Sequence, residues 1–312
     1  MLAIVAPGQG AQTPGFLAPW LEDATFRTRL EWFSAVADLD LVAHGTTSDS
    51  ETIRDTAVAQ PLLVASALAA AQQLFLHEDA VANMGVVAGH SVGELTAAAI
   101  AGVLTPETAM VLVRERGRAM AAASAITPTS MTAVIGGDSE EVLAAIEAAG
   151  LTPANNNGSG QIVAAGTVEQ LSLLADNAPR RARLIPLSVA GAFHTHHMAP
   201  AVARLETLAA AVAVEPPHVR LLSNSDGAVV ASGPEYVTRL VNQVANPVRW
   251  DLCMATMAEL NVTGLLELPP AGTLTGIAKR NLKGIELFSL NTPDQLEEAR
   301  AFCAAHAISP TA

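Results

Sequence analysis

The sequence is poor in charge, in aromatic residues and in cysteine. Only 15% of its 312 residues are charged and only 4% are aromatic, whereas 50% are hydrophobic. The net charge of −13 argues against binding to nucleic acid or to an anionic membrane surface, because both are bound by basic faces. Cys253 and Cys303 lie far apart without a CxxC spacing, which argues against a disulfide framework and a cysteine zinc site.

The N-terminus lacks a basic region followed by a long apolar run, so no signal peptide is predicted. No stretch of about 18 apolar residues is free of charge, glycine and proline, and no transmembrane helix is predicted. These absences indicate a cytoplasmic protein, and we expect a monomer without a membrane partner. A chain of this length fits one large domain or two modest ones.

Short apolar runs alternate with helical patterns in the first part of the chain. The predicted segments are strands at 2–6 and 86–88, and helices at 60–76, from 94 onward and at 106–123. Pro61 falls in the first turn of one predicted helix and Pro106 at the first position of another, where proline is tolerated. Alternating strands and helices predict an α/β fold with a parallel sheet.

Residues 127–189 follow another order of elements. The predicted segments are strands at 131–135, 151–154, 161–165 and 182–186, and helices at 139–149 and 168–178. This β-α-β-β-α-β order is typical of a ferredoxin-like unit. We therefore expect 127–189 to be a subdomain inserted in a larger domain made of 1–126 and 190–312. Further buried strands are predicted at 264–268 and 286–290, and a loose tail at 307–312.

The segment Gly-His-Ser-Val-Gly at 89–93 matches the nucleophile-elbow pattern G-x-S-x-G and lies between a predicted strand and a predicted helix. Its glycines permit a sharp turn that exposes the Ser91 hydroxyl, and the helix N-terminus favours developing negative charge. The sequence therefore predicts that Ser91 is a catalytic nucleophile. The alternative is a glycine turn with a structural role only.

A serine nucleophile needs a base, and His194, His196 and His197 cluster just after the predicted insert. No acid of a triad is evident. The acids considered begin a helix of the insert or follow the histidines in the chain: Asp138, Glu140, Glu141, Asp226 and Asp251. We predict a Ser-His dyad whose imidazole is oriented by a backbone or amide carbonyl. Three close imidazoles also suggest zinc, but a fourth ligand is not evident.

Arg116 lies on the apolar stripe of the helix predicted after Pro106. At 100° per residue it shares that stripe with four apolar residues: Ala109, Leu112, Val113 and Met120. A buried guanidinium needs a partner. Spacing alone leaves two alternatives, a structural ion pair or a bidentate clamp for a substrate carboxylate.

Five motifs in order resemble those of the malonyl-CoA:acyl carrier protein transacylase family, over essentially the whole chain. They are PGQGAQ at 7–12, GHSVGE at 89–94, RERGRAM at 114–120, GAFHTHHM at 191–198 and NQVANPVRW at 242–250. The resemblance implies an α/β-hydrolase-like domain with an inserted ferredoxin-like subdomain. It also implies that a malonyl group moves from coenzyme A, through a serine ester, to the phosphopantetheine thiol of an acyl carrier protein. The product that the resemblance implies would serve fatty acid synthesis, polyketide synthesis or both.

The resemblance also assigns roles to residues of this sequence. Ser91 resembles the nucleophile, His194 the base and Arg116 the arginine that pairs with the malonyl carboxylate. Gln9 and Val92 resemble the residues whose backbone amides form the oxyanion hole. No metal or bound cofactor is implied, and malonyl-CoA is a substrate.

Further residues receive supporting roles from the same resemblance. Gln243 resembles the glutamine whose carbonyl orients the histidine, and His90 either supports the site or contacts the acyl group. Phe193 occupies the position where malonyl-selective relatives carry phenylalanine and methylmalonyl-selective ones serine. The segment 155–157, three asparagines, resembles one at the edge of the cleft.

Two other functions remain open on the sequence. A serine hydrolase shares the elbow, although the missing acid and the inward Arg116 disfavour it. A non-catalytic scaffold that docks a carrier protein is disfavoured by the complete set of Ser91, His194 and Arg116. Docking of an acidic carrier protein requires a local basic patch, and two clusters are candidates: Arg180, Arg181 and Arg183, and Lys279, Arg280 and Lys283. The alternative is that either cluster is an ordinary solvated surface.

Overall fold

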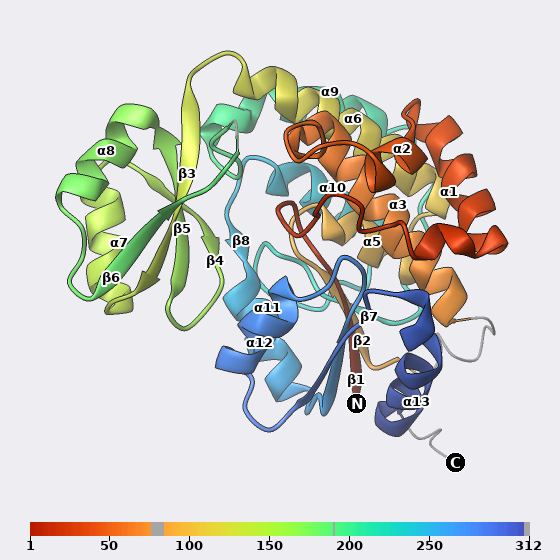
Figure 1. The fold of residues 1–312 in the computed structure, drawn as a ribbon. Helices are drawn as coiled ribbons and strands as arrows, with labels where there is room; N and C mark the ends of the chain where they lie inside the picture. The colour runs from red at the N-terminus through yellow and green to blue at the C-terminus, as the bar shows by residue number, and fades with distance from the viewer. Residues whose placement is uncertain (76–83, 190, 309–312) are drawn as a thin grey trace.

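The computed structural model describes residues 1–75, 84–189 and 191–308, and it contains two sheets (Figure 1). The first is wholly parallel, with strand order β10-β9-β1-β2-β7. Its strands are β1 Leu2–Ala6, β2 Val86–Gly89, β7 Arg220–Leu221, β9 Gly264–Glu267 and β10 Glu286–Ser289. The predicted parallel sheet is therefore confirmed.

Alternate residues of β1 enter two hydrophobic cores, one on each face of this sheet. Leu2 and Ile4 belong to the larger core, whereas Ala3 and Val5 belong to the core on the other face. A strand buried on both faces reads as a continuous apolar run, and this explains why the sequence identified it.

Helices cover both faces of the parallel sheet (Figure 1). Their bounds are α1 Ala24–Ala37, α2 Leu41–Thr46, α3 Thr56–Leu74, α5 Gly93–Ile100, α6 Pro106–Ser124, α9 Ala199–Ala209, α10 Gly233–Gln243, α11 Trp250–Glu259, α12 Thr273–Asn281 and α13 Leu296–His306. Short 3-10 turns lie at Trp20–Glu22, Thr52–Arg54, His196–Met198 and Pro293–Gln295.

The helix predicted at 60–76 begins four residues earlier than expected. Asp55 is its N-cap and accepts a hydrogen bond from the Ala57 amide (2.7 Å), so α3 starts at Thr56 and Pro61 lies inside it rather than in its first turn. The predicted end at Leu76 lies outside the described residues. α3 alone among the described helices is long and apolar enough to cross a membrane, and most of it is buried within the protein.

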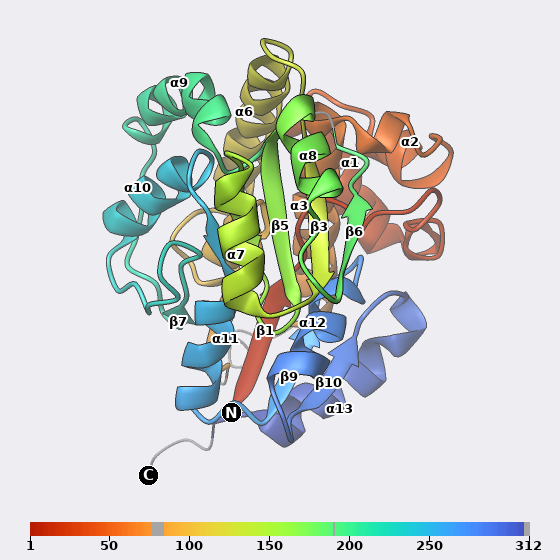
Figure 2. The ribbon, with the colours of Figure 1, turned by 90° about the vertical axis from the view of Figure 1, so that its left-hand side faces the viewer.

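The second sheet has the strand order β6-β3-β5-β4-β8. Its elements are β3 Thr129–Gly136, α7 Ser139–Ala148, β4 Thr152–Asn156, β5 Gln161–Thr167, α8 Val168–Asp176, β6 Ala182–Pro186 and β8 Val248–Arg249. Neighbours among β3 to β6 are antiparallel, which is the predicted ferredoxin-like arrangement. Figure 2 shows α7 and α8 covering the outer face of this sheet.

β8 was not predicted, and it joins the small sheet from far along the chain. Val248 and Arg249 pair in parallel with Asn155 and Asn156 of β4. A strand of two residues has no periodicity that a sequence could display. The structure is thus an α/β-hydrolase-like sheet with a ferredoxin-like unit to which the later chain adds an edge strand.

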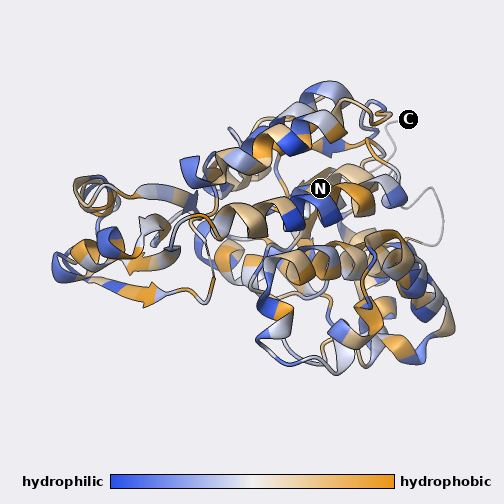
Figure 3. Ribbon diagram, turned by 90° about the horizontal axis from the view of Figure 1, so that it is seen from above, coloured by the Kyte–Doolittle hydropathy of each residue, from blue (hydrophilic) through white to orange (hydrophobic). Residues whose placement is uncertain are grey.

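Seen from above, the small sheet and its helices project to one side of the larger helical layer (Figure 3). Hydrophilic and hydrophobic residues alternate along most helices in this view, as expected for helices with one buried face. At the centre of the parallel sheet, β1 and β2 are neighbours and their carboxyl ends point the same way. Ligands of open α/β sheets bind at such an edge.

Candidate active site

Ser91 lies in the turn between β2 and α5 with a backbone φ of 53°, in the left-handed region. A non-glycine residue held there costs about 1–3 kcal/mol, so the surrounding structure must enforce the conformation. The strand and the helix approach closely at this turn. A Cβ atom on Gly89 would lie 1.9 Å from the Gly93 carbonyl carbon, so only glycine fits at position 89.

His194 contacts the Ser91 hydroxyl from the loop before α9. Its Nε2 lies 2.9 Å from Ser91 Oγ, and its Nδ1 lies 2.9 Å from the backbone carbonyl oxygen of Gln243. A carbonyl only accepts hydrogen bonds, so Nδ1 carries the proton and Nε2 is free to accept the serine proton. The Gln243 side-chain Nε2, 3.2 Å from Nδ1, would favour the other tautomer. The shorter contact to the carbonyl favours the assignment made here.

Burial lowers the pKa of His194 to about 3, and the positive charge of Arg116 adds to this effect. The hydrogen bond to the Gln243 carbonyl opposes the shift, and only 3% of the His194 surface is exposed. The imidazole is therefore neutral at physiological pH. A neutral imidazole hydrogen-bonded to a hydroxyl is the protonation state that a general base requires.

Arg116 is 5% exposed, and its hydrogen bonds to the described residues all go to neutral groups. It donates to Gln60 Oε1 (2.7 Å), Gln243 Oε1 (3.2 Å) and Ser91 Oγ (3.2 Å). Within the part of the chain that the structure describes, no carboxylate forms a salt bridge with it. Burial lowers its pKa to about 10, with Glu94 acting in the opposite direction. A buried cation beside a nucleophile, without a counter-ion, is suited to an anionic ligand.

A cleft of about 500 Å³ lies between the two sheets, next to the elbow. Its lining includes Gln9, His90 and Asn155, each from a motif noted in the sequence. Arg54 is the one lysine or arginine among the described lining residues. The other walls come from the β1 loop, β5, the segment after β6 and the start of α12.

The remaining predicted site residues lie around the same cleft. Buried His90 places Nε2 2.9 Å from Asn157 Oδ1, and burial lowers its pKa. Gln9 directs its side-chain amide toward the Arg54 carbonyl (3.4 Å) and Thr56 Oγ1 (3.3 Å).

The backbone amides of Gln9 and Val92 donate to no acceptor within the described part of the chain. Phe193 is 5% exposed and packs in the hydrophobic cluster with Ala119 and Met120. It does not belong to the described lining of the cleft.

The three clustered histidines do not converge on one point. His194 turns to Ser91, while the rings of His196 and His197 lie with centroids 4.1 Å apart. In residues 1–75, 84–189 and 191–308, no group of three His, Cys, Asp or Glu residues is placed to hold a metal ion.

Two contacts of the site were not predicted from the sequence. Gln60 binds Arg116, and its signal was a polar residue at the head of an otherwise apolar run, the same type of signal that identified Arg116. Asn224 binds the backbone of the elbow from the loop after β7. Nothing local in the sequence distinguishes Asn224 from an ordinary turn asparagine.

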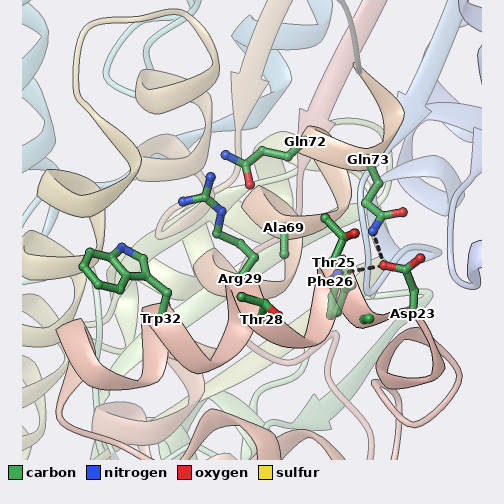
Figure 4. Close-up of a pocket in the computed structure, with 10 residues that line it drawn as sticks. Asp23, Thr25, Phe26, Thr28, Arg29, Trp32, Ala69, Gln72 and Gln73 are labelled. Carbon is green, nitrogen blue, oxygen red and sulfur yellow. Dashed lines mark hydrogen bonds between the residues drawn. The ribbon is translucent and has the colours of Figure 1, made fainter.

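A wider hollow of about 780 Å³ lies on α1 and α3 (Figure 4). Arg29, Trp32 and Gln72 line it, and Gln73 binds Asp23 there (2.6 Å). Its described lining contains no histidine and no residue of the elbow, whereas His90 of the elbow lines the smaller cleft. Size alone therefore does not identify the reactive site.

The chain matches the acyl transferase domain family over residues 4–300. It is 49% identical over 298 residues to the malonyl CoA-acyl carrier protein transacylase of Mycobacterium tuberculosis, covering 96% of this chain and 99% of that protein. The crystal structure of MCAT from Mycobacterium tuberculosis is similar with a TM-score of 0.92 at 49% identity, covering 96% of this chain and 99% of that one.

A malonyl-transacylase solved in complex with a type II PKS acyl-carrier protein is also similar. Its TM-score is 0.88 at 30% identity, with 96% of this chain and 99% of that chain covered. These similarities extend over nearly the full length of each protein. The turn that carries Ser91, and the His194 and Arg116 side chains that contact it, lie within the region that the family matches. The chain belongs to the malonyl CoA-acyl carrier protein transacylase family of acyl transferase domains.

Proposed function

We propose that this protein transfers a malonyl group from malonyl-CoA to the phosphopantetheine thiol of an acyl carrier protein, through a malonyl ester of Ser91. The observation that carries the proposal is Arg116, a buried cation 3.2 Å from Ser91 Oγ that has no carboxylate partner among the described residues. A malonyl thioester has a free carboxylate one methylene from the reacting carbonyl. Its binding would supply the missing counter-ion.

In the first half-reaction, Ser91 Oγ attacks the thioester carbonyl as His194 Nε2 takes the hydroxyl proton. The free amides of Val92 and Gln9 stabilise the oxyanion, as preorganised donors do in acyl transfer. The C–S bond then breaks, and His194 returns its proton to the departing thiolate of coenzyme A. The products are malonyl-Ser91 and free coenzyme A.

In the second half-reaction, the thiol of the carrier protein's phosphopantetheine arm gives its proton to His194 and attacks the ester of Ser91. Collapse of the tetrahedral intermediate releases the serine oxygen, which recovers the proton. Two half-reactions through one covalent intermediate give ping-pong kinetics without a metal or a bound cofactor. Gln243 serves throughout by holding His194 in the tautomer whose Nε2 is free.

The cleft is proposed to hold the pantetheine arm, which both substrates share. Asn155 supports this role because its Oδ1 is buried, has no hydrogen-bond partner in the described part of the chain and is available to an amide of the arm. Arg54, the basic residue of the lining, is suited to the phosphate at the far end of the arm. His90 supports the cleft wall through Asn157, and Phe193 restricts the space beside the acyl group.

We also propose the domain organisation and the setting of the enzyme. The antiparallel pairing of β3 to β6 supports an inserted subdomain at 127–189, with 1–126 and 190–312 forming the catalytic domain. A cytoplasmic monomer without a nucleic-acid or membrane partner is consistent with the net charge and with the burial of α3. Its product would feed fatty acid or polyketide synthesis.

Mass spectrometry of the intact protein after incubation with malonyl-CoA tests the function. Wild type should gain one malonyl group, located on Ser91 by peptide mapping, and Ser91→Ala should gain none while keeping its circular dichroism spectrum. Added carrier protein should discharge the adduct faster than water does. A malonyl group on another residue, or discharge to water alone, would contradict the proposal.

A further inference from the structure

Asn224 is completely buried in the loop after β7, and its side chain bridges the elbow. Its Oδ1 accepts a hydrogen bond from the Ser91 amide (2.7 Å), and its Nδ2 donates to the Gly89 carbonyl (2.8 Å). β7 pairs with β2 only as far as Val87, where the Leu222 amide still donates to the Val87 carbonyl. Beyond that point, the side-chain amide of Asn224 takes the place of a neighbouring strand.

Glu94 fixes Asn224 in this place. It lies in the first turn of α5, is 1% exposed, and accepts a hydrogen bond from the Asn224 amide through Oε1 (2.7 Å). On the other side, the Asn224 carbonyl accepts a hydrogen bond from the Arg249 amide (2.8 Å). Both backbone groups of Asn224 and both ends of its side-chain amide are therefore held.

These hydrogen bonds act where the elbow is strained. Ser91 has a positive φ. The Asn224 side chain hydrogen-bonds to the two peptide groups that precede Ser91, through the Gly89 carbonyl and the Ser91 amide. Relaxation of Ser91 to a negative φ would swing its Cα–Cβ bond and break the 2.9 Å contact between Oγ and His194. The Ser91 amide is occupied by Asn224, and the next amide, that of Val92, donates to no acceptor among the described residues and is available to the substrate.

We propose that Asn224, held by Glu94, is a positioning residue that keeps Ser91 in the backbone conformation from which its hydroxyl reaches both His194 and the acyl carbonyl. The proposal rests on the function proposed above and adds a buried polar pair to it. Glu94 does not act as a direct partner of Arg116, because no salt bridge joins them among the described residues.

The test compares Asn224→Leu, Asn224→Asp, Glu94→Leu and Glu94→Gln with wild type in rapid-quench measurements of malonyl-Ser91 formation. For Asn224→Leu, we expect the maximal acylation rate to fall about 100-fold, with KM for malonyl-CoA within about threefold, because misplacement of a nucleophile affects the chemical step. Glu94→Gln keeps an oxygen toward the Asn224 amide and should recover most of the rate that Glu94→Leu loses. Leu174→Ala, in the buried cluster under α8, is the destabilised control whose acylation rate should stay near that of wild type.

If Asn224→Leu does not fold, Asn224→Asp decides, because it keeps the acceptor for the Ser91 amide and loses the donor to Gly89. An acylation rate near that of wild type in the folded variant would overturn the proposal, as would a loss confined to KM. The rate of Ser91 labelling by a fluorophosphonate is measured in parallel, since it reports the hydroxyl without malonyl-CoA. Slow labelling in the variants together with no malonylation of wild type would refute the proposed function and leave the positioning role standing.

Discussion

At the scale of single residues, Arg116 is unusual because its charged side chain is buried among neutral groups. Its buried charge is met by amide and hydroxyl oxygens and by no carboxylate among the described residues. Arg116→Ala should therefore reduce malonyl transfer far more than acetyl transfer, since acetyl has no carboxylate. Loss of one partner of a buried charge pair costs about 3–5 kcal/mol, so the preference for malonyl should fall by about 100-fold or more.

The measurement is kcat/KM for malonyl-CoA and for acetyl-CoA in the same variant. Arg118→Ala is the matched control, because Arg118 lies two residues along the same helix and forms an exposed pair with Asp38. Its acyl preference should equal that of wild type. Equal losses for both acyl groups in Arg116→Ala would mean that the arginine has a structural role.

Glu94 predicts a pH dependence of stability. Burial raises its pKa from 4.5 to about 8, so between pH 6.5 and 8 the folded protein keeps a proton that the unfolded chain has lost. The free energy of unfolding should therefore fall as pH rises through this window, by up to about 1.4 kcal/mol per pH unit. Below pH 6.5, His194 acts in the opposite sense, because its pKa is lowered to about 3 and the unfolded chain binds the extra proton.

Urea denaturation of wild type and Glu94→Gln between pH 6.5 and 8 tests this expectation. Glutamine cannot ionise, so the variant should show a much flatter profile. If the free energy of unfolding changes with pH equally in the two proteins, the pH dependence comes from a group other than Glu94.

At the scale of elements, the packing of α6 on α3 positions Arg116 beside Gln60. Gly117 lies at this contact, where an added Cβ would be 2.9 Å from the Thr56 carbonyl oxygen. Gly117→Ala should separate the helices, destabilise the protein by about 1–3 kcal/mol and slow malonyl transfer. In Gly276→Ala, within α12, the added Cβ meets nothing within 4 Å, and helix propensity predicts a gain of about 0.5–1 kcal/mol.

Thermal unfolding of the two variants distinguishes packing from propensity. The melting temperature should fall in Gly117→Ala and rise in Gly276→Ala, although both replace glycine with alanine within a helix. A stabilised Gly117→Ala would show that the interface of α3 and α6 adjusts without cost.

The sequence could predict those features whose signal lies in residues that are neighbours along the chain. β6 was predicted at 182–186 and is found at Ala182–Pro186, since an apolar strand between turns carries its own pattern. The sequence also predicted that Arg116 faces the core, because helical periodicity is a pattern of neighbouring residues. β8 and Asn224 could not be predicted, because each depends on a neighbour about a hundred residues away in the chain. The start of α3 was missed because its cap, Asp55, stands five residues before the apolar run.

At the scale of the whole molecule, charge opposes binding of an acidic carrier protein, since the chain itself carries −13. A local basic patch acts only within about 8–10 Å at physiological salt. The structure favours the cluster Lys279, Arg280 and Lys283, because α12 lines the cleft and Arg280 binds Gln161 of its wall (3.1 Å). Reversal of these three charges should lower kcat/KM for the carrier protein roughly tenfold and weaken its salt dependence.

Reversal of Arg180, Arg181 and Arg183, also exposed, is the matched control and should have a smaller effect. Acylation by malonyl-CoA is measured in both variants to separate the two half-reactions. If neither reversal changes transfer to the carrier protein or its salt dependence, docking is mainly hydrophobic.

The pairing of β8 with β4 has a consequence for recombination between relatives. An exchange of 127–189 alone would join a new β4 to the β8 of the original parent, at Val248 and Arg249. The same stretch of chain carries Gln243, whose backbone carbonyl accepts a hydrogen bond from His194. A mismatched pairing of β4 and β8 would therefore lie a few residues from the group that orients His194. Chimeras of this fold should therefore carry 243–250 together with the insert as one cassette, although the two segments are more than fifty residues apart in the chain.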